Sequence, residues 1–131
     1  MKIWICGLLA AGLLSGCAVG VNENSPTVSY TVPRDYLTVY HRAEDQAQKC
    51  LRGENAYSVR GRLDRASRSG SVDVVAPLDA TVMARTQFQA LDDGRTRVTQ
   101  SVWGRLVWDR KALDAMRASV FMDTSMCTAY R

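Results

Sequence analysis

Four cysteines and one histidine are the side chains of this 131-residue sequence with the widest range of chemistry. The cysteines are Cys6, Cys17, Cys50 and Cys127, and the histidine is His41. A thiol can be alkylated, oxidised to a disulfide or bound to a metal ion, whereas an imidazole can transfer a proton or bind a metal. No two cysteines have the CxxC spacing and only one histidine is available, so the spacing argues against a metal or redox site.

The first 16 residues have the pattern of an export signal. Lys2 is followed by an uncharged apolar run, Ile3–Leu14, which has the length of a signal peptide and is too short to span a membrane. The run leads into Leu14-Ser15-Gly16-Cys17: a branched apolar residue, two small residues and a cysteine. Small residues let a peptidase close on an extended backbone, and the thiol is a soft nucleophile suited to alkylation.

This tetrapeptide resembles the lipobox of bacterial lipoproteins. The resemblance implies that Cys17 receives a diacylglyceryl group, that residues 1–16 are removed as a signal peptide, and that the new amino terminus is acylated. Acyl chains contribute ~0.8 kcal/mol per buried methylene, so two or three of them make a lasting anchor. Ala18 stands where an inner-membrane retention signal would have Asp, which favours the outer membrane, with the protein facing the periplasm. The alternatives are an ordinary secretory signal containing a cysteine and an uncleaved anchor.

Two cysteines remain once Cys6 has left with the signal and Cys17 carries lipid. An exported protein meets an oxidising compartment, so Cys50 and Cys127 are expected to form one disulfide. Closing so long a loop would stabilise the fold by ~4 kcal/mol at most. A metal or redox pair is the alternative, and we expect neither metal nor cofactor.

The rest of the chain predicts one domain over residues 27–131, because its length suits a single core. Residues 17–26, the lipidated cysteine and a short aperiodic stretch, are expected to tether this domain close to the membrane. Residues 27–32 alternate in polarity up to Pro33, which fits either a short strand or an extended lead-in.

Helical periodicity appears twice. The first helix is predicted to begin at Asp35 as its N-cap and to stop at Gly53, with Cys50 in its last turn on the buried face. A second helix is predicted from Asp109, and Cys127 lies just beyond it. The apolar stripes of the two helices are Tyr36, Tyr40, Ala43, Ala47 and Cys50 in the first, and Ala112, Leu113, Met116 and Val120 in the second.

Four runs between the helices alternate with period two, over residues 57–63, 71–76, 82–90 and 95–102. Asp92-Asp93-Gly94 is a hairpin turn signal between the last two. We therefore expect an α+β fold: a four-stranded antiparallel meander, covered on one face by the N-terminal and C-terminal helices (α-β-β-β-β-α) and joined by one disulfide.

The sequence offers little catalytic machinery. His41 falls on the polar side of the first helix, and its neighbours Glu44 and Asp45 diverge around the helix, which is poor geometry for paired carboxylates. None of the common nucleophile, phosphate-loop, dinucleotide or calcium motifs occurs. We expect no enzymatic activity and no catalytic residue.

Arginines dominate the predicted solvent face of the sheet. Guanidinium groups bind phosphates and carboxylates in a bidentate manner, so this face could recognise a lipid, a lipopolysaccharide or an acidic partner. Arginine as a soluble filler of an exposed sheet is the alternative, with Asp73 the one acid among them. Trp103 and Trp108 either close the end of the core or mark a docking site. The candidate binding residues are Arg60, Arg62, Arg85, Arg95, Arg97 and Trp103.

Two classes of function remain. One is a non-enzymatic envelope module that binds a protein, lipid or glycan; the other is a carrier holding a small apolar ligand between helices and sheet. The chain as a whole resembles small uncharacterised envelope lipoproteins of proteobacteria, which implies no known activity. Loss of Lys2 with residues 1–16 lowers the formal charge from +4 to +3, and the expected location argues against nucleic acid as a partner. Three structural features distinguish these functions. A carrier should have an enlarged cavity, and a binding module should have an exposed patch. An enzyme should have a deep pocket that brings His41 together with Glu44 or Asp45.

Overall fold

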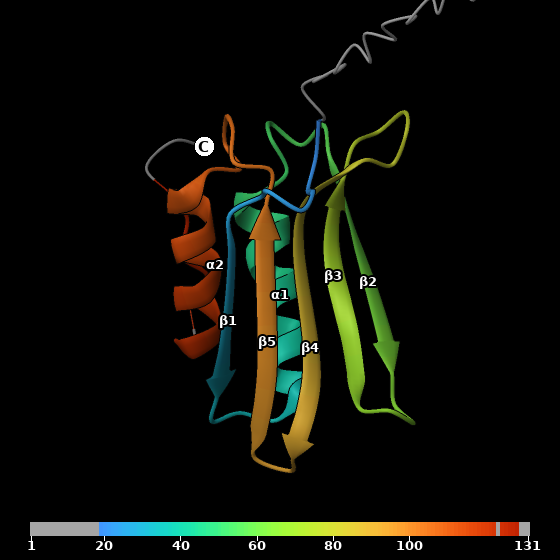
Figure 1. Cartoon of the computed structure of the whole chain (residues 1–131), viewed down its shortest axis with the longest axis vertical. Coiled ribbons are helices and arrows are strands. Elements are labelled where there is room, and N and C mark those ends of the chain that lie inside the picture. Colours follow the sequence, from blue (N-terminus) through green and yellow to red (C-terminus); the bar gives the residue numbers. More distant parts are fainter. Residues whose placement is uncertain (1–18, 123, 129–131) are drawn as a thin grey trace, which may run out of the picture.

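The computed structural model describes residues 19–122 and 124–128, so the expected signal and Cys17 lie outside the described residues. Five strands and two helices follow one another in the order β1-α1-β2-β3-β4-β5-α2 (Figure 1). The strands are β1 (Thr27–Val32), β2 (Ser58–Asp64), β3 (Ser69–Val75), β4 (Val82–Asp92) and β5 (Arg95–Val102). The helices are α1 (Tyr36–Cys50) and α2 (Arg110–Phe121).

The sheet is antiparallel throughout, with strand order β1-β5-β4-β3-β2. Strands β2 to β5 form the expected meander, but the predicted four-stranded sheet and its α-β-β-β-β-α order are wrong. The six residues of β1 pair with β5, from Thr27 opposite Ser101 to Val32 opposite Thr96, which adds a fifth strand at the edge. Local periodicity allowed this strand but could not show its partner, which lies more than 60 residues away in the sequence.

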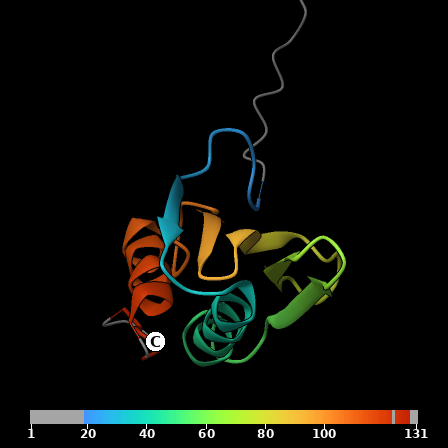
Figure 2. The same ribbon diagram turned by 90° about the horizontal axis from the view of Figure 1, so that it is seen from below.

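Both helices cover the same face of the sheet, as expected (Figure 2). Each begins at a capping aspartate: Asp35 accepts a hydrogen bond from the backbone N–H of Thr38 (3.2 Å), and Asp109 accepts one from Ala112 (3.0 Å). The predicted stripe of α2 is fully buried. In α1 the alanines of the stripe are buried and the tyrosines and Cys50 are partly buried at its edge.

The core lies between the helices and the inner face of the sheet. Its strand residues follow the predicted alternation except where β3 ends and β4 begins: Val75 and Met83 were expected outside but are buried, and Val82 was expected inside. The pairing of β3 with β4 shifts between Val74 and Val75, and Met83 becomes part of the core at 1% exposure. A bulge adds one residue to a strand, so the periodicity before it cannot predict the side on which Met83 lies.

The two ends of the sheet differ in their connections (Figure 1). Val75, Val82 and Val102 lie at one end, where β1 also begins. We call this the loop end, since four segments meet there: residues 19–26, 51–57, 76–81 and 103–109. The opposite end, the turn end, has three short connections, residues 33–35, 65–68 and 93–94.

The expected disulfide between Cys50 and Cys127 is present, with 5.1 Å between the Cα atoms. Because α2 is antiparallel to α1, its last turn lies far from Cys50, and the chain after Phe121 runs back along α1 to reach it. Gln46, buried in α1, donates a hydrogen bond to the backbone oxygen of Met126 (3.1 Å), and Ser119 accepts one from the Met126 N–H (2.7 Å). The returning segment, residues 122 and 124–128, is thus fastened to both helices through Met126.

Candidate partner-binding face

The outer face of the sheet, opposite the helices, is polar. In register, Arg60, Asp73, Arg85 and Ser101 form one cross-strand row. Arg62 begins a second row that continues through Ser71, Gln87 and Thr99, and a third row contains Asp64, Ser69, Gln89 and Arg97. The strand registers therefore place Arg60, Arg62, Arg85 and Arg97 on one surface of the sheet.

Two of the five arginines have acidic partners. Arg85 donates two hydrogen bonds to Asp73, Nε to Oδ1 at 2.9 Å and an Nη to Oδ2 at 3.1 Å. This bidentate contact raises the pKa of the Arg85 guanidinium. Arg95 donates to Asp92 at 2.8 Å across the hairpin, and that hydrogen bond lowers the pKa of the Asp92 carboxyl. These two arginines are partly neutralised within the fold.

The other three arginines are available to a partner. Arg60, Arg62 and Arg97 are exposed, and within residues 19–122 and 124–128 no acidic side chain lies within ion-pair distance of them. Arg60 and Arg62 lie on the edge strand β2, whereas Arg97 lies on β5, with β3 and β4 between them. The positive charge is therefore spread over the sheet and not gathered in one pocket.

Hydroxyl groups extend this polar face across β5 and β1, the strands toward its other edge. Thr27 and Ser101 share a hydrogen bond of 2.9 Å, and Ser29 and Thr99 share one of 3.0 Å, both across β1 and β5. Sequence reasoning singled out the arginines and missed this ladder, although the alternation of Thr27, Ser29 and Thr31 was its signal. Together the groups form a flat surface rich in hydrogen-bond donors.

Trp103 is not part of this flat surface, although it was grouped with the arginines. It lies half-buried at the end of β5, with its ring centre 6.5 Å from that of Trp108. Trp108 is buried, donates its indole N–H to the backbone oxygen of Leu51 (3.0 Å), and meets the ring of Tyr57 edge-on at 4.5 Å. The two tryptophans close the core at the loop end, the more common of the two roles considered.

An open groove of about 350 Å³ does bring His41 beside Glu44 and Asp45, together with Ser125 of the returning segment. Both His41 and Asp45 are exposed. Asp45 is engaged by Lys49 at 2.7 Å and by the Ser125 hydroxyl at 3.2 Å, and the contact with Lys49 lowers its pKa. The groove is open to solvent and Asp45 in it is paired with Lys49, unlike the deep pocket that would indicate an enzyme.

The interior between helices and sheet is made of packed apolar side chains. Val39, Phe88, Val98, Leu113 and Met116 are among its closely packed residues. The four surface grooves described are lined by residues of helices and loops, none by the inner face of the sheet. This packing favours the outer face over a carrier cavity as the place where a ligand would bind.

Buried polar groups in this interior are paired with one another. Tyr30 donates its hydroxyl to Gln100 (2.8 Å), and the Gln100 amide donates to Thr86 (3.2 Å). Burial raises the pKa of the Tyr30 phenol. Sequence reasoning did not assign Gln100, whose burial follows from its row between Val28 and Thr86. The chain of hydrogen bonds satisfies these groups and so serves the core.

In the part of the chain that the structure describes, no group of three or more potential metal ligands occurs. Nor is any helix there long and apolar enough to cross a membrane. No known protein family matches the chain, and no curated protein matches it. Its function must therefore be argued from its own residues.

Proposed function

We propose that this chain is an envelope lipoprotein, anchored in the outer membrane through Cys17 and facing the periplasm, whose domain is a non-enzymatic binding module for an anionic partner. The single observation that carries the binding role is the outer sheet face, which neither helix covers and on which Arg60, Arg62 and Arg97 have no described acidic partner. The anchor is supported by the lipobox-like residues Leu14 to Cys17.

The face suits carboxylate or phosphate groups presented on an extended surface. A guanidinium offers paired N–H donors that match such groups, and the neighbouring hydroxyls and amides of Ser71, Gln87 and Thr99 can accept or donate further hydrogen bonds. A flat, polar, partly hydrated interface of this kind gives specificity through its pattern of donors. A protein or glycan bearing acidic groups fits that pattern.

The anchor is tested by the intact mass of membrane-extracted protein, measured before and after reduction. We expect the mass of residues 17–131 with acyl chains, rising by about two protons on reduction of the one disulfide. A Cys17→Ser variant should remain unprocessed and lose its acyl groups. An unacylated wild-type protein would refute the anchor and leave the sheet face to be tested on a secreted domain.

The binding face is tested by photo-crosslinking from position 87, where Gln87 is exposed in the middle of the arginine rows. In intact cells we expect a discrete adduct that is lost when Arg62 and Arg97 are both changed to Glu. Changing Arg34 and Arg65 to Glu gives the same change of net charge in the turn-end connections and is the matched control. An adduct that survives the Arg62 and Arg97 reversal, or the absence of any adduct, would show that the arginines serve only solubility.

A further inference from the structure

The loop end displays the most exposed large apolar side chains of the described residues. Leu78 is 99% exposed, Leu106 74% and Val19 59%. They belong to three different connections, residues 76–81, 103–109 and 19–26, which the strand registers bring to one end of the sheet. Leu78, Leu106 and Val19 are therefore exposed on three separate segments at the same end of the sheet.

The backbone holds these leucines in place. Leu106 has a φ of 55°, a left-handed conformation that is costly for a leucine, and the turn around it is closed by a hydrogen bond from the Trp108 N–H to the Arg105 oxygen (3.1 Å). Next to Leu78, the Asp79 carboxylate accepts a hydrogen bond from the Thr81 N–H (3.0 Å). The apolar side chains are thus presented on ordered turns.

The start of the described chain is fastened to the same end. Val21 donates its N–H to the backbone oxygen of Val82 (2.7 Å), and Pro26 accepts from Val102 (3.1 Å). Gly20 is buried at a φ of 99°, and a side chain there would collide with Thr81 and with the Val82 oxygen. Most of the expected tether is therefore part of the domain.

Because Gly20 is held in the domain, only a short segment joins Cys17 to it. Three residue steps join Cys17 to Gly20, which span at most ~11 Å when fully extended. A lipid on Cys17 would therefore hold the loop end, and no other part of the domain, against the bilayer surface.

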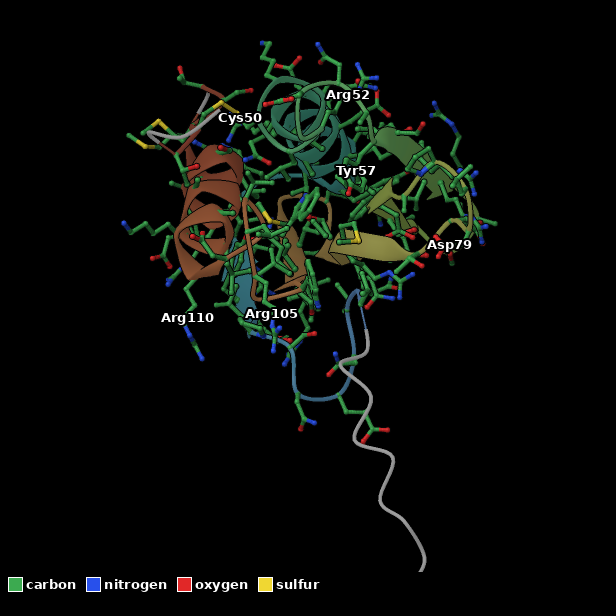
Figure 3. All side chains as sticks on the ribbon, turned by 90° about the horizontal axis from the view of Figure 1, so that it is seen from above. Cys50, Arg52, Tyr57, Asp79, Arg105 and Arg110 are labelled. Atoms are coloured by element: carbon green, nitrogen blue, oxygen red, sulfur yellow. A yellow bond between two sulfur atoms is a disulfide. The ribbon has the colours of Figure 1, made fainter. Side chains whose placement is uncertain are left out.

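Basic side chains accompany the apolar ones. Arg105 and Arg110 lie on one side of the loop end and Asp79 on the other (Figure 3). A groove of about 320 Å³ beside Leu106 is lined by that leucine, Val107, Asp109, Lys111 and Thr128. Apolar side chains that enter the headgroup region, with arginine and lysine at phosphate level, are typical of surfaces that contact a membrane.

From these observations we propose that the loop end docks on the bilayer that carries the protein's own anchor, with Leu78 and Leu106 among the lipid headgroups and Arg105 and Arg110 on lipid phosphates. This inference rests on the proposed lipid anchor. In the docked orientation, the strands run along the membrane normal. Since the ten residue steps of β4 rise by ~33 Å, the turn end points away from the membrane.

The test uses the full acylated protein in vesicles of phosphatidylethanolamine and phosphatidylglycerol, with acyl chains either unmodified or brominated. Trp is introduced singly by Leu78→Trp, Leu106→Trp or Leu91→Trp. Leu91, near the turn end of β4 and 48% exposed, is the matched control. Bromine quenches only nearby fluorophores, and the wild-type protein supplies the background from Trp103 and Trp108.

We expect added quenching at positions 78 and 106 at least about threefold that at position 91, because headgroup insertion brings only the first two within ~5–10 Å of the acyl boundary. Equal quenching at all three positions, in protein that floats with the vesicles, overturns the docking while the anchor stands. If the protein floats with the vesicles but shows no quenching at positions 78 and 106, the docking proposal is also overturned. In that case another protein would be the binding partner of these leucines. Protein that neither floats nor carries acyl mass refutes the anchor itself, and this inference with it.

Discussion

The loop end and the turn end close the same sheet by different means. At the turn end each connection is short and closed by an aspartate: Asp35 caps α1, Asp64 accepts from the N–H groups of Ala66 and Ser67, and Asp92 accepts from Gly94. The loop end also has local aspartate closures, at Asp79 and Asp109, but adds distant contacts that include the Cys50–Cys127 disulfide and the indole of Trp108.

Backbone strain follows the same division. Most residues with positive φ lie at the loop end, namely Gly20, Gly53, Glu54, Asn55, Ala80, Gly104 and Leu106, against Arg68 at the turn end. Glycine adopts a positive φ without strain, whereas at Glu54, Asn55, Ala80 and Leu106 such a conformation persists only where the surrounding structure enforces it, and such residues concentrate at functional surfaces. The comparison indicates that the turn end is a stable closure and the loop end a surface shaped for contact.

Trp108→Ala is expected to have the largest effect, because it removes a buried ring that joins two loop-end segments, residues 51–57 and 103–109. We expect a loss of about 3–5 kcal/mol in the free energy of unfolding, measured by urea denaturation. Trp108→Phe keeps the ring contacts with Tyr57 but leaves the Leu51 oxygen without its indole donor, and should cost about 1–3 kcal/mol. Equal losses for the two variants would show that the hydrogen bond, and not the packing, matters.

Removing the disulfide by changing Cys50 and Cys127 to Ala should cost about 2–4 kcal/mol, since the bond closes a loop with a sequence separation of 77. Hydrogen exchange should rise first in residues 122–128 and the last turn of α1, while the turn-end amides stay protected. Uniform loss of protection over both ends would contradict the view that the ends are stabilised separately.

Asp35→Ala, at the turn end, should cost about 1 kcal/mol at neutral pH through loss of the α1 cap. The hydrogen bond with Thr38 lowers the pKa of Asp35 below its ordinary value of 3.8. A carboxyl with a lowered folded-state pKa stabilises the fold above its unfolded pKa and ceases to do so as pH falls through the folded value. The difference in thermal stability between wild type and variant should therefore shrink below pH 3.8. Asp35→Asn, which can still cap, is the control.

Arg68→Ala should have the smallest effect. Its ion pair with Asp93 (2.6 Å) joins two turn-end connections but is largely exposed, so its loss should cost less than about 0.5 kcal/mol and vanish at high salt. A double-mutant cycle with Asp93→Ala measures the coupling directly. A coupling above about 1 kcal/mol would mean that the turn end, too, depends on contacts between connections.

Elements set by local sequence could be predicted, and those set by distant contacts could not. The caps Asp35 and Asp109, the stripe of α2 and the turn before Gly94 depend on near neighbours. The pairing of β1 with β5, the bulge that buries Met83 and the return of the chain to Cys50 depend on partners far along the sequence, which periodicity does not show.

The candidate binding face, too, could be predicted only where its features depend on local sequence. Period two was enough to place Arg60, Arg62 and Arg97 on one side of the sheet. The register between β3 and β4 was needed to show that Asp73 pairs with Arg85. Arg60, Arg62 and Arg97 are then left without an acidic partner among the described residues. Trp103 was misgrouped because its strand ends there and the loop carries its ring toward Trp108.

The covalent loop closed by Cys50 and Cys127 contains every described strand except β1. That strand follows directly on the segment leading to Cys17, so any pull between the lipid and a partner on the sheet would act along its axis. The six pairs with β5 would then be strained together in shear, which resists force far better than separation one pair at a time. Strand β1, which periodicity alone could not distinguish from an extended lead-in, would then be the element that transmits force between the domain and its anchor.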